Sequence, residues 1–320
     1  MSRLGVAVIG AGFWGKNHVR VFSELQETQL VAVCDVDVEK AKAIAQQYGV
    51  DAYSDSRKLL KRKEVKAVSI CTWTTTHAAE AMRALRAGKH VLVEKPIASN
   101  IREARKIVKL AEQSDRHLMV GFIERFNPSV QRAKDMLRKG EIGELVSATA
   151  TRVSQWPQRI GDVGVVKDYA IHEIDIMRKV FEEDPTKVYA MAGNLKHTKF
   201  EDYAQIMLTF KHGKTAFIEA NWLTPNKIRR LTLTGSDAIL SLNYLTQEVS
   251  IENLTRMLKP RYEWKEPLKL ELQHFARSLL KDKEFEVTGM DGLKALMIAE
   301  AALKSSESGG MVNLRLDSLI

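Results

Sequence analysis

Three glycines near the start of the chain have the spacing of a phosphate-binding turn. Gly10, Gly12 and Gly15 follow a run of small and β-branched residues, Gly5 to Ile9, which has the composition of a buried parallel strand. In a G-x-G-x-x-G turn, one glycine permits the tight bend, one lets the backbone approach a pyrophosphate, and one lets the next helix pack closely on the strand. The free N–H groups at the helix start then face the phosphates. The sequence therefore predicts a dinucleotide site whose first contacts are Gly10, Gly12, Phe13, Trp14 and Gly15.

A strand predicted over Leu30–Cys34 ends in a carboxylate, Asp35. It stands about 20 residues beyond the glycine turn, where an acidic residue hydrogen-bonds the ribose diol of the adenosine. The same charge repels a ribose 2′-phosphate, and no arginine follows directly to bind one. We therefore expect NAD rather than NADP. The alternative role, a helix cap, suits Asp37 better than the residue at the strand end.

The first 122 residues alternate between strand and helix patterns, as in a doubly wound parallel sheet. Ligands of such sheets bind at the carboxyl ends of the strands, and polar side chains follow further strands there. The expected cofactor contacts from these strand ends are Cys71, Thr72, His77, Glu94 and Lys95. Two of them have a second interpretation: His77 as a cap of the next helix, and Lys95 as a solvated side chain.

Beyond Gly121 the alternation stops. Several strand patterns follow one another between residues 187 and 251 without intervening helices, which indicates a mostly antiparallel open sheet. Helices, the first near Leu268–Leu280, end the chain. The predicted fold is α/β, with a Rossmann dinucleotide-binding domain over residues 1–122 and an α+β domain over residues 123–320.

Composition narrows the class of protein. Of the 320 residues, 45% are hydrophobic and 28% are charged, as is usual for a globular chain. The net charge of +9 comes from lysines and arginines that alternate with glutamates along helical faces, and no nucleic-acid-binding motif accompanies them. No apolar run has membrane-spanning length and no signal peptide is evident, so we expect a cytoplasmic location and no membrane or nucleic-acid partner. Cys34 and Cys71 are expected as buried free thiols rather than as a disulfide or a metal site.

Besides the glycine turn, His18 shortly after it and Asp35, several further blocks of residues form a recognisable pattern. They are Ala87–Pro96, Gly121-Phe122 with Arg125 and Asn127-Pro128, the pattern Asp168-x-x-x-His172-x-x-Asp175, and the tail from Gly292 to Ser306. Together these blocks span nearly the whole chain. In this combination the chain resembles the glucose–fructose oxidoreductase, inositol dehydrogenase and MocA oxidoreductases.

The resemblance implies an NAD(P)-dependent dehydrogenase of sugar or polyol hydroxyls, with Lys95, Asp168 and His172 as the catalytic group. These residue types suit the reaction. Oxidation of a secondary alcohol needs a base for the hydroxyl proton while a hydride leaves the same carbon, and histidine titrates in the required range. Asp168, four residues before His172, can orient the ring from the same side of a helix. Lys95 can stabilise negative charge on the reacting oxygen.

One departure from the family pattern concerns the stretch before His77. The chain has Thr74-Thr75-Thr76 there, where an asparagine is commoner in the family. Side-chain contacts of this segment with a cofactor are therefore left open.

Substrate identity is suggested by two stretches, residues 121–128 and 159–178. They resemble the branch that oxidises nucleotide sugars, in particular UDP-N-acetylglucosamine 3-dehydrogenases, which form a 3-keto sugar. Arginine suits a diphosphate because its donors are forked. The expected substrate contacts are Arg125, Asn127, Arg152, Arg159, Asp168 and His172. Two alternatives stay open: the arginines as surface or ion-paired residues, and a free polyol such as inositol as the substrate.

The family resemblance also has implications for the oligomeric state and for whether the protein is an enzyme. It implies a homodimer or homotetramer that assembles through the second domain. It also leaves open a non-catalytic NAD-binding regulator, although the presence of Lys95, Asp168 and His172 argues for an enzyme.

Overall fold

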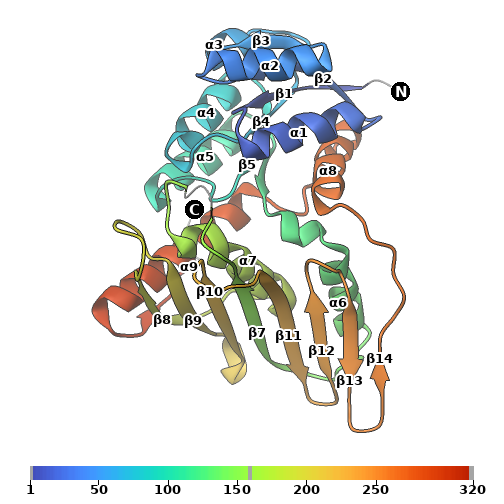
Figure 1. Cartoon of the computed structure of the whole chain (residues 1–320), viewed down its shortest axis with the longest axis vertical. Coiled ribbons are helices and arrows are strands. Elements are labelled where there is room, and N and C mark those ends of the chain that lie inside the picture. The colour runs from blue at the N-terminus through green and yellow to red at the C-terminus, as the bar shows by residue number, and fades with distance from the viewer. Residues whose placement is uncertain (1–2, 158–160, 317–320) are drawn as a thin grey trace. The chain divides into compact units, whose positions relative to one another are not determined.

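The computed structural model of the chain describes residues 3–157 and 161–316 (Figure 1). By internal packing the chain divides into two compact units. Unit 1 comprises Met1–Ile123 and Glu266–Leu293, and unit 2 comprises Glu124–Lys265 and Lys294–Ile320. Each unit has its own sheet, one parallel and one mostly antiparallel. The expected fold class is confirmed.

Unit 1 contains a six-stranded parallel sheet in the order β3-β2-β1-β4-β5-β6. Its strands are β1 (Leu4–Ile9), β2 (Thr28–Cys34), β3 (Asp51–Tyr53), β4 (Ala67–Ile70), β5 (His90–Glu94) and β6 (Leu118–Gly121). Every residue of β1 and β4 is buried, as expected of central strands with helices on both faces. The strand order reverses between β1 and β4, which is the point where such sheets bind their ligands.

Some helices of unit 1 begin at a residue whose side chain caps them. They are α1 (Phe13–Glu24), α2 (Val38–Tyr48), α3 (Ser56–Leu59), α4 (Thr74–Arg86), α5 (Ile101–Gln113) and α8 (Pro267–Lys281). Asp37 caps α2 by accepting the Lys40 N–H at 3.3 Å, as the sequence suggested. Gly49 ends the same helix in the left-handed region, with a φ of 65°.

The helix α8 corrects the expected division of the chain, which assigned residues 123–320 to one domain. Its buried face of Leu268, Leu272, Phe275 and Ala276 packs with α1 and β1 of unit 1. Glu266 at its start pairs with Arg20 of α1, and Arg277 donates to Glu27 at 2.7 Å. The apolar spacing predicts the helix, but it carries no information about which sheet the helix covers.

Unit 2 contains a nine-stranded sheet in the order β14-β13-β12-β11-β7-β10-β9-β8-β15. Its strands are β7 (Leu145–Val153), β8 (Lys187–Gly193), β9 (Tyr203–Thr209), β10 (Thr215–Asn221), β11 (Ile228–Gly235), β12 (Ile239–Asn243), β13 (Val249–Glu252), β14 (Met257–Leu258) and β15 (Val312–Asn313). All its pairings are antiparallel except β7 with β10.

Among the described residues, helices cover one face of this second sheet. Buried and accessible residues alternate along β9 and β10, as in a sheet with one face on the core. The helices α6 (Pro128–Arg138) and α7 (Ile171–Phe181) pack on the buried face, α6 on β12 and β13 and α7 on β7 and β10. Helix α9 (Gly289–Ser308) begins in unit 1 and continues into unit 2, where Ser305 accepts the Ala190 N–H of β8 at 3.0 Å.

Two helix starts differ from expectation. Helix α4 begins at Thr74 rather than at His77, so His77 lies inside its first turns and is not its cap. The helix expected from Asp168 has an irregular start: residues Val166–Ala170 form a π-helix, η2, and the regular α7 follows. Both cysteines are buried free thiols, as predicted. Among residues 3–157 and 161–316, no helix has the length and apolarity needed to cross a membrane.

Candidate active site

The glycine turn after β1 leaves no space for side chains. Gly10 has a φ of 101°, and a Cβ there would lie 2.6 Å from the Cys71 carbonyl carbon. A Cβ at Gly15 would lie 1.7 Å from the Gly10 carbonyl oxygen. The turn connects β1 to α1 and lies against Cys71 at the carboxyl end of β4, the neighbour across which the strand order reverses. Both glycines are therefore required by geometry at the expected cofactor site.

The start of α1 is suited to bind an anion. Gly12 is its N-cap residue and provides no side-chain cap, and the first turn has no acidic residue. Its N–H groups are thus available to a phosphate. The next residue, Phe13, is 72% exposed, and Trp14 beside it is 40% exposed. Apolar rings this accessible at a strand end are consistent with contacts to a ligand.

Asp35 lies at the end of β2, beside the glycine turn. One carboxylate oxygen, Oδ2, accepts the Ala11 N–H at 2.6 Å, and the other accepts the Asp37 N–H at 2.9 Å. The carboxylate therefore ties the turn to the second strand. Each oxygen retains a further lone pair, so both backbone contacts are compatible with a ribose diol as an additional partner.

The segment after β4 reaches its neighbours mainly through backbone contacts. Cys71 is buried and its backbone lies against Gly10, while the Thr72 hydroxyl accepts from Thr76 at 2.8 Å. His77 is 1% exposed, with Nδ1 2.8 Å from the Pro96 carbonyl and Nε2 3.1 Å from the Thr72 carbonyl. The ring thus bridges the segments that follow β4 and β5. This placement favours a positioning role for His77 over a cofactor contact.

Glu94, expected as a cofactor contact, is a buried internal partner. Its Oε1 accepts from His18 Nε2 at 3.1 Å, and Ser69 Oγ lies 2.7 Å from the other ring nitrogen. Burial alone favours a neutral His18, but the neighbouring Cys71 and Glu94 raise its pKa well above the ordinary value. A Cβ at Gly121 would lie 2.9 Å from the Glu94 carboxylate, which fills this space. His18 therefore links α1 to β4 through Ser69 and to β5 through Glu94.

Lys95 follows β5 directly and is half-buried. Its backbone N–H donates to Glu94 Oε2 at 3.3 Å, and the bond to Pro96 is cis. Glu94 and Pro96 are both buried, so Lys95 stands between two fixed neighbours at the carboxyl end of a central strand.

Asp168 and His172 lie on one continuous helical segment of unit 2. Asp168 is in the π-helix η2 and is half-buried, and His172 is in the first turn of α7 and is 7% exposed. Glu201 holds the start of the segment by accepting the Val166 N–H at 3.1 Å. π-Helical turns occur frequently at functional sites. The carboxylate of Asp168 and the imidazole of His172 thus lie four residues apart across a π-helical turn. The third expected catalytic residue, Lys95, belongs to unit 1.

The expected substrate arginines lie in buried ion pairs. Arg125 donates to both oxygens of Asp175, at 2.7 and 2.6 Å. Arg152 donates to Glu173 at 2.7 Å and to Glu124 at 2.6 Å. The ion-pair alternative therefore describes both arginines, and a contact of either one with substrate stays a prediction. Arg159 lies outside the described residues.

Asn127 is also a structural residue. Its side-chain oxygen caps α6 by accepting the Ser129 N–H at 3.1 Å, and its amide donates to Glu124 and to the Tyr244 carbonyl. The residue is 1% exposed. Its role is to hold the helix start against the charged cluster rather than to reach a substrate.

A cationic pair that the sequence reasoning missed lies at the start of β11. Arg229 pairs in register with Arg152 across β7 and β11, and its Nη1 donates to Glu124 at 3.3 Å. Its guanidinium also lies over the Tyr169 ring, 5.9 Å from the centroid. Lys227 is exposed two residues earlier, and the charge of Arg229, then burial, lowers its pKa. The signal in the sequence is the close spacing of two cations, Lys227 just before β11 and Arg229 within it.

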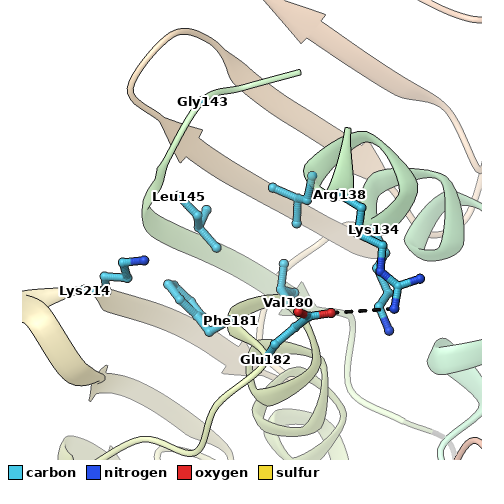
Figure 2. Close-up of a pocket in the computed structure, with 9 residues that line it drawn as sticks. Lys134, Arg138, Gly143, Leu145, Val180, Phe181, Glu182 and Lys214 are labelled. Carbon is cyan, nitrogen blue, oxygen red and sulfur yellow. Dashed lines mark ion pairs between the residues drawn. The ribbon is translucent and has the colours of Figure 1, made fainter. Parts of the chain in front are cut away.

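Figure 2 shows a separate pocket in unit 2, formed by α6, the end of α7 and the starts of β7 and β10. Lys134, Arg138 and Lys214 surround it, and Arg138 lies 3.7 Å from Glu182. None of the expected catalytic, cofactor or substrate residues lines it.

Comparison with known proteins identifies both halves of the chain. Residues 4–122 match the profile of an oxidoreductase family with an NAD-binding Rossmann fold. Residues 130–241 match the C-terminal domain of the glucose–fructose oxidoreductase, inositol dehydrogenase and MocA proteins.

Individual relatives agree with these matches. The chain is 31% identical to inositol 2-dehydrogenase of Rhizobium meliloti, over 93% of this chain and 95% of the relative. It is 30% identical to UDP-N-acetylglucosamine 3-dehydrogenase of Acidithiobacillus ferrooxidans, over 78% of this chain and 77% of the relative. A solved structure of that second enzyme is 27% identical and superimposes with a TM-score of 0.88, covering 96% of this chain and 99% of its own.

Proposed function

Because the chain belongs to the glucose–fructose oxidoreductase, inositol dehydrogenase and MocA family of NAD-binding oxidoreductases, which act on sugars and polyols, we propose that its substrate is a nucleotide sugar and that Lys95, Asp168 and His172 carry out the proton chemistry. The proposed reaction oxidises the C3 hydroxyl of a UDP-N-acetylhexosamine to a ketone. The observation that carries the catalytic part is the placement of Asp168 and His172 on the η2–α7 segment.

The cofactor fits the residues of unit 1. Gly10 and Gly15 form a cradle that any Cβ would fill, and the uncapped start of α1 supplies N–H donors for a pyrophosphate. Asp35 has the position and the charge for a ribose diol without a 2′-phosphate. NAD, when bound, accepts the hydride of the substrate carbon.

The chain itself handles the proton and the charge. The O–H bond of the substrate breaks as its proton moves to the His172 imidazole. Asp168 stabilises the imidazolium that forms and keeps the ring oriented. The Lys95 ammonium donates to the oxygen as negative charge develops on it. The electron pair of the C–H bond leaves with the hydride, and a ketone remains.

Two findings support a nucleotide sugar, and one supports an alternative. A relative at 30% identity is a UDP-N-acetylglucosamine 3-dehydrogenase, and unit 2 contains the cations Lys227 and Arg229. The alternative, a free polyol such as inositol, is favoured by the relative at 31% identity.

The deciding experiment is a substrate panel. Purified protein is incubated with NAD and UDP-N-acetylglucosamine, UDP-N-acetylgalactosamine, UDP-glucose, myo-inositol or D-chiro-inositol, and reduced cofactor is followed by absorbance. The carbon oxidised on any substrate consumed is then located by NMR. Consumption of a UDP-N-acetylhexosamine with a ketone at C3 is the expected result. Turnover of inositols alone would reject the nucleotide-sugar proposal and leave the polyol alternative.

A further inference from the structure

Two arginines face each other across the middle of the second sheet. Arg152 of β7 and Arg229 of β11 are direct partners in the antiparallel register, on the face that the helices cover. Like charges directly opposite each other destabilise a sheet. Such a pair persists only where other groups offset the repulsion or where a ligand supplies the missing negative charge.

The described carboxylates offset only part of it. Arg152 is held by Glu124 and Glu173, whereas Arg229 shares Glu124 at 3.3 Å. The buried Nε of Arg229 has no hydrogen-bond partner among the described residues. Lys227 adds a third cation, and the pKa of Lys227 falls chiefly because of Arg229. Arg152 and Arg229 thus share Glu124, and Glu173 pairs with Arg152.

A second unsatisfied donor lies in the same neighbourhood. The Trp222 indole Nε1 is buried and has no partner within the described part of the chain. Its ring stands edge-on to Tyr169, 6.1 Å between centroids, and Tyr169 is the residue over which the Arg229 guanidinium lies. Buried donors without acceptors cost free energy, and two of them lie around one tyrosine without an acceptor among the described residues.

Sequence position connects this cluster to the candidate catalytic residues. Tyr169 directly follows Asp168 in η2 and precedes His172 by less than one helical turn. Its hydroxyl lies 3.0 Å from Ser154 Oγ, just after β7. A substrate oxidised at His172 would therefore extend past Tyr169 toward the start of β11.

We propose that Lys227 and Arg229, with the Trp222 indole, form an anion subsite that selects substrates carrying a phosphate or a carboxylate beside the oxidised ring. This inference rests on the proposed sugar oxidation at His172 and names the residues that recognise the charged part. Lys227 is the residue to substitute, because its side chain is exposed and its replacement is not expected to disturb the fold. Arg229 is more buried than Lys227, with 23% of its side chain exposed.

The test compares Lys227→Gln with Arg230→Gln. Arg230 is an exposed cation of β11 whose side chain points to the face opposite Arg229, so Arg230→Gln removes an equal charge close to Lys227 in the sequence. For UDP-N-acetylglucosamine, Lys227→Gln is expected to raise KM about tenfold with little change in kcat, since a charge-assisted contact is lost. Arg230→Gln is expected to leave KM nearly unchanged, and Lys227→Arg to retain the wild-type value.

Direct binding keeps the subsite and the catalytic proposal distinguishable. Isothermal titration with UDP, pyrophosphate and glucuronate tests the subsite without turnover and separates a phosphate ligand from a carboxylate ligand. Binding of any of them that Lys227→Gln weakens and Arg230→Gln does not supports the subsite, even if no hydroxyl is oxidised. Equal effects of the two variants, or binding of none of the three anions, overturn it, even if myo-inositol is oxidised efficiently.

Discussion

At the scale of single residues, the candidate chemistry rests on His172. This ring is nearly buried in the first turn of α7, next to the π-turn that holds Asp168. His172→Ala removes the proposed base and leaves a space within unit 2. We expect turnover to fall by about 10²- to 10⁴-fold, the usual contribution of a general base.

Cofactor affinity is the control for that variant. The glycine cradle and Asp35 lie in unit 1, so NADH binding measured by fluorescence is expected to stay near the wild-type value. A parallel loss of NADH binding and of turnover would show that His172 supports the fold or the cofactor rather than the proton transfer.

Asp35 leads to a second prediction, that the protein prefers NAD to NADP. Its carboxylate already accepts two backbone N–H groups, from Ala11 and Asp37, so its negative charge is held in place beside the glycine turn. We expect kcat/KM with NAD to exceed that with NADP by at least about tenfold, because an unscreened like charge costs more than about 1.4 kcal/mol.

The matching variant is Asp35→Asn, which keeps the shape and removes the charge. The ratio of the two kcat/KM values is expected to move toward NADP, with some loss for both cofactors because one backbone contact becomes unfavourable. Equal use of both cofactors by the wild-type protein would contradict the assigned role.

At the scale of elements, the turn between β1 and α1 has no tolerance for a methyl group. Gly15→Ala would place a Cβ 1.7 Å from the Gly10 carbonyl, so strand and helix must separate. We expect loss of measurable NADH binding and a lowered midpoint of thermal unfolding. Gly49→Ala is the control: it meets only strain from a φ of 65°, about 1–2 kcal/mol, with open space around the Cβ. Normal NADH binding by Gly15→Ala would refute the cradle.

The buried His18–Glu94 pair predicts how stability depends on pH. The pKa of His18 is raised in the fold, so the protonated ring stabilises the native state. This contribution is complete below the unfolded-state pKa of about 6.5 and is lost as the pH rises through the folded value, by at most about 1.4 kcal/mol per pH unit. Urea unfolding at a series of pH values measures it.

Two variants test the origin of this slope. His18→Gln is expected to be less stable than the wild-type protein, and its free energy of unfolding is expected to fall less as the pH rises. His212→Asn is the control, because His212 is exposed and asparagine accepts its left-handed φ of 56°. An unchanged alkaline slope in His18→Gln would assign the dependence to other groups.

The elements also show what the sequence can and cannot reveal. The central strands β1 and β4 are predictable because burial on both faces makes them continuous apolar runs, and Asp37 and Gly49 mark the ends of α2 by their chemistry. The start of α4 is missed because its first turn, Thr74-Thr75-Thr76, has no apolar period. The pairing of Arg125 with Asp175 joins residues 50 apart, and nothing in local spacing selects such a partner. The sequence therefore predicts Arg125 and Arg152 as substrate contacts without revealing their buried ion pairs, and it does not single out Lys227 and Arg229.

At the scale of the whole molecule, we propose a homodimer or homotetramer that assembles through the open face of the nine-stranded sheet. Tyr189, Met207 and Phe217 line up across β8, β9 and β10 in register. Met207 is 36% exposed, Phe217 is 40% exposed, and Met191 nearby is 60% exposed. A contiguous apolar patch of this kind marks an interaction surface.

The test is the double variant Met207→Lys with Phe217→Lys, which puts two charges into the patch. Light scattering after gel filtration is expected to show a monomer, whereas the wild-type protein and Gln46→Lys, an exposed site on α2, stay oligomeric. A wild-type monomer, or an oligomer that survives both charges, would rule out this surface.

The return of α8 to unit 1 has a consequence for biosynthesis. On the ribosome, the six strands of unit 1 emerge first, yet the helix that covers α1 and β1 follows only after about 140 further residues, from Glu124 to Lys265, a delay on the order of ten seconds. During that interval the apolar surface awaiting Leu268, Leu272 and Phe275 stays open to solvent. The folding of the first unit is thus completed by one of the last segments to be synthesised.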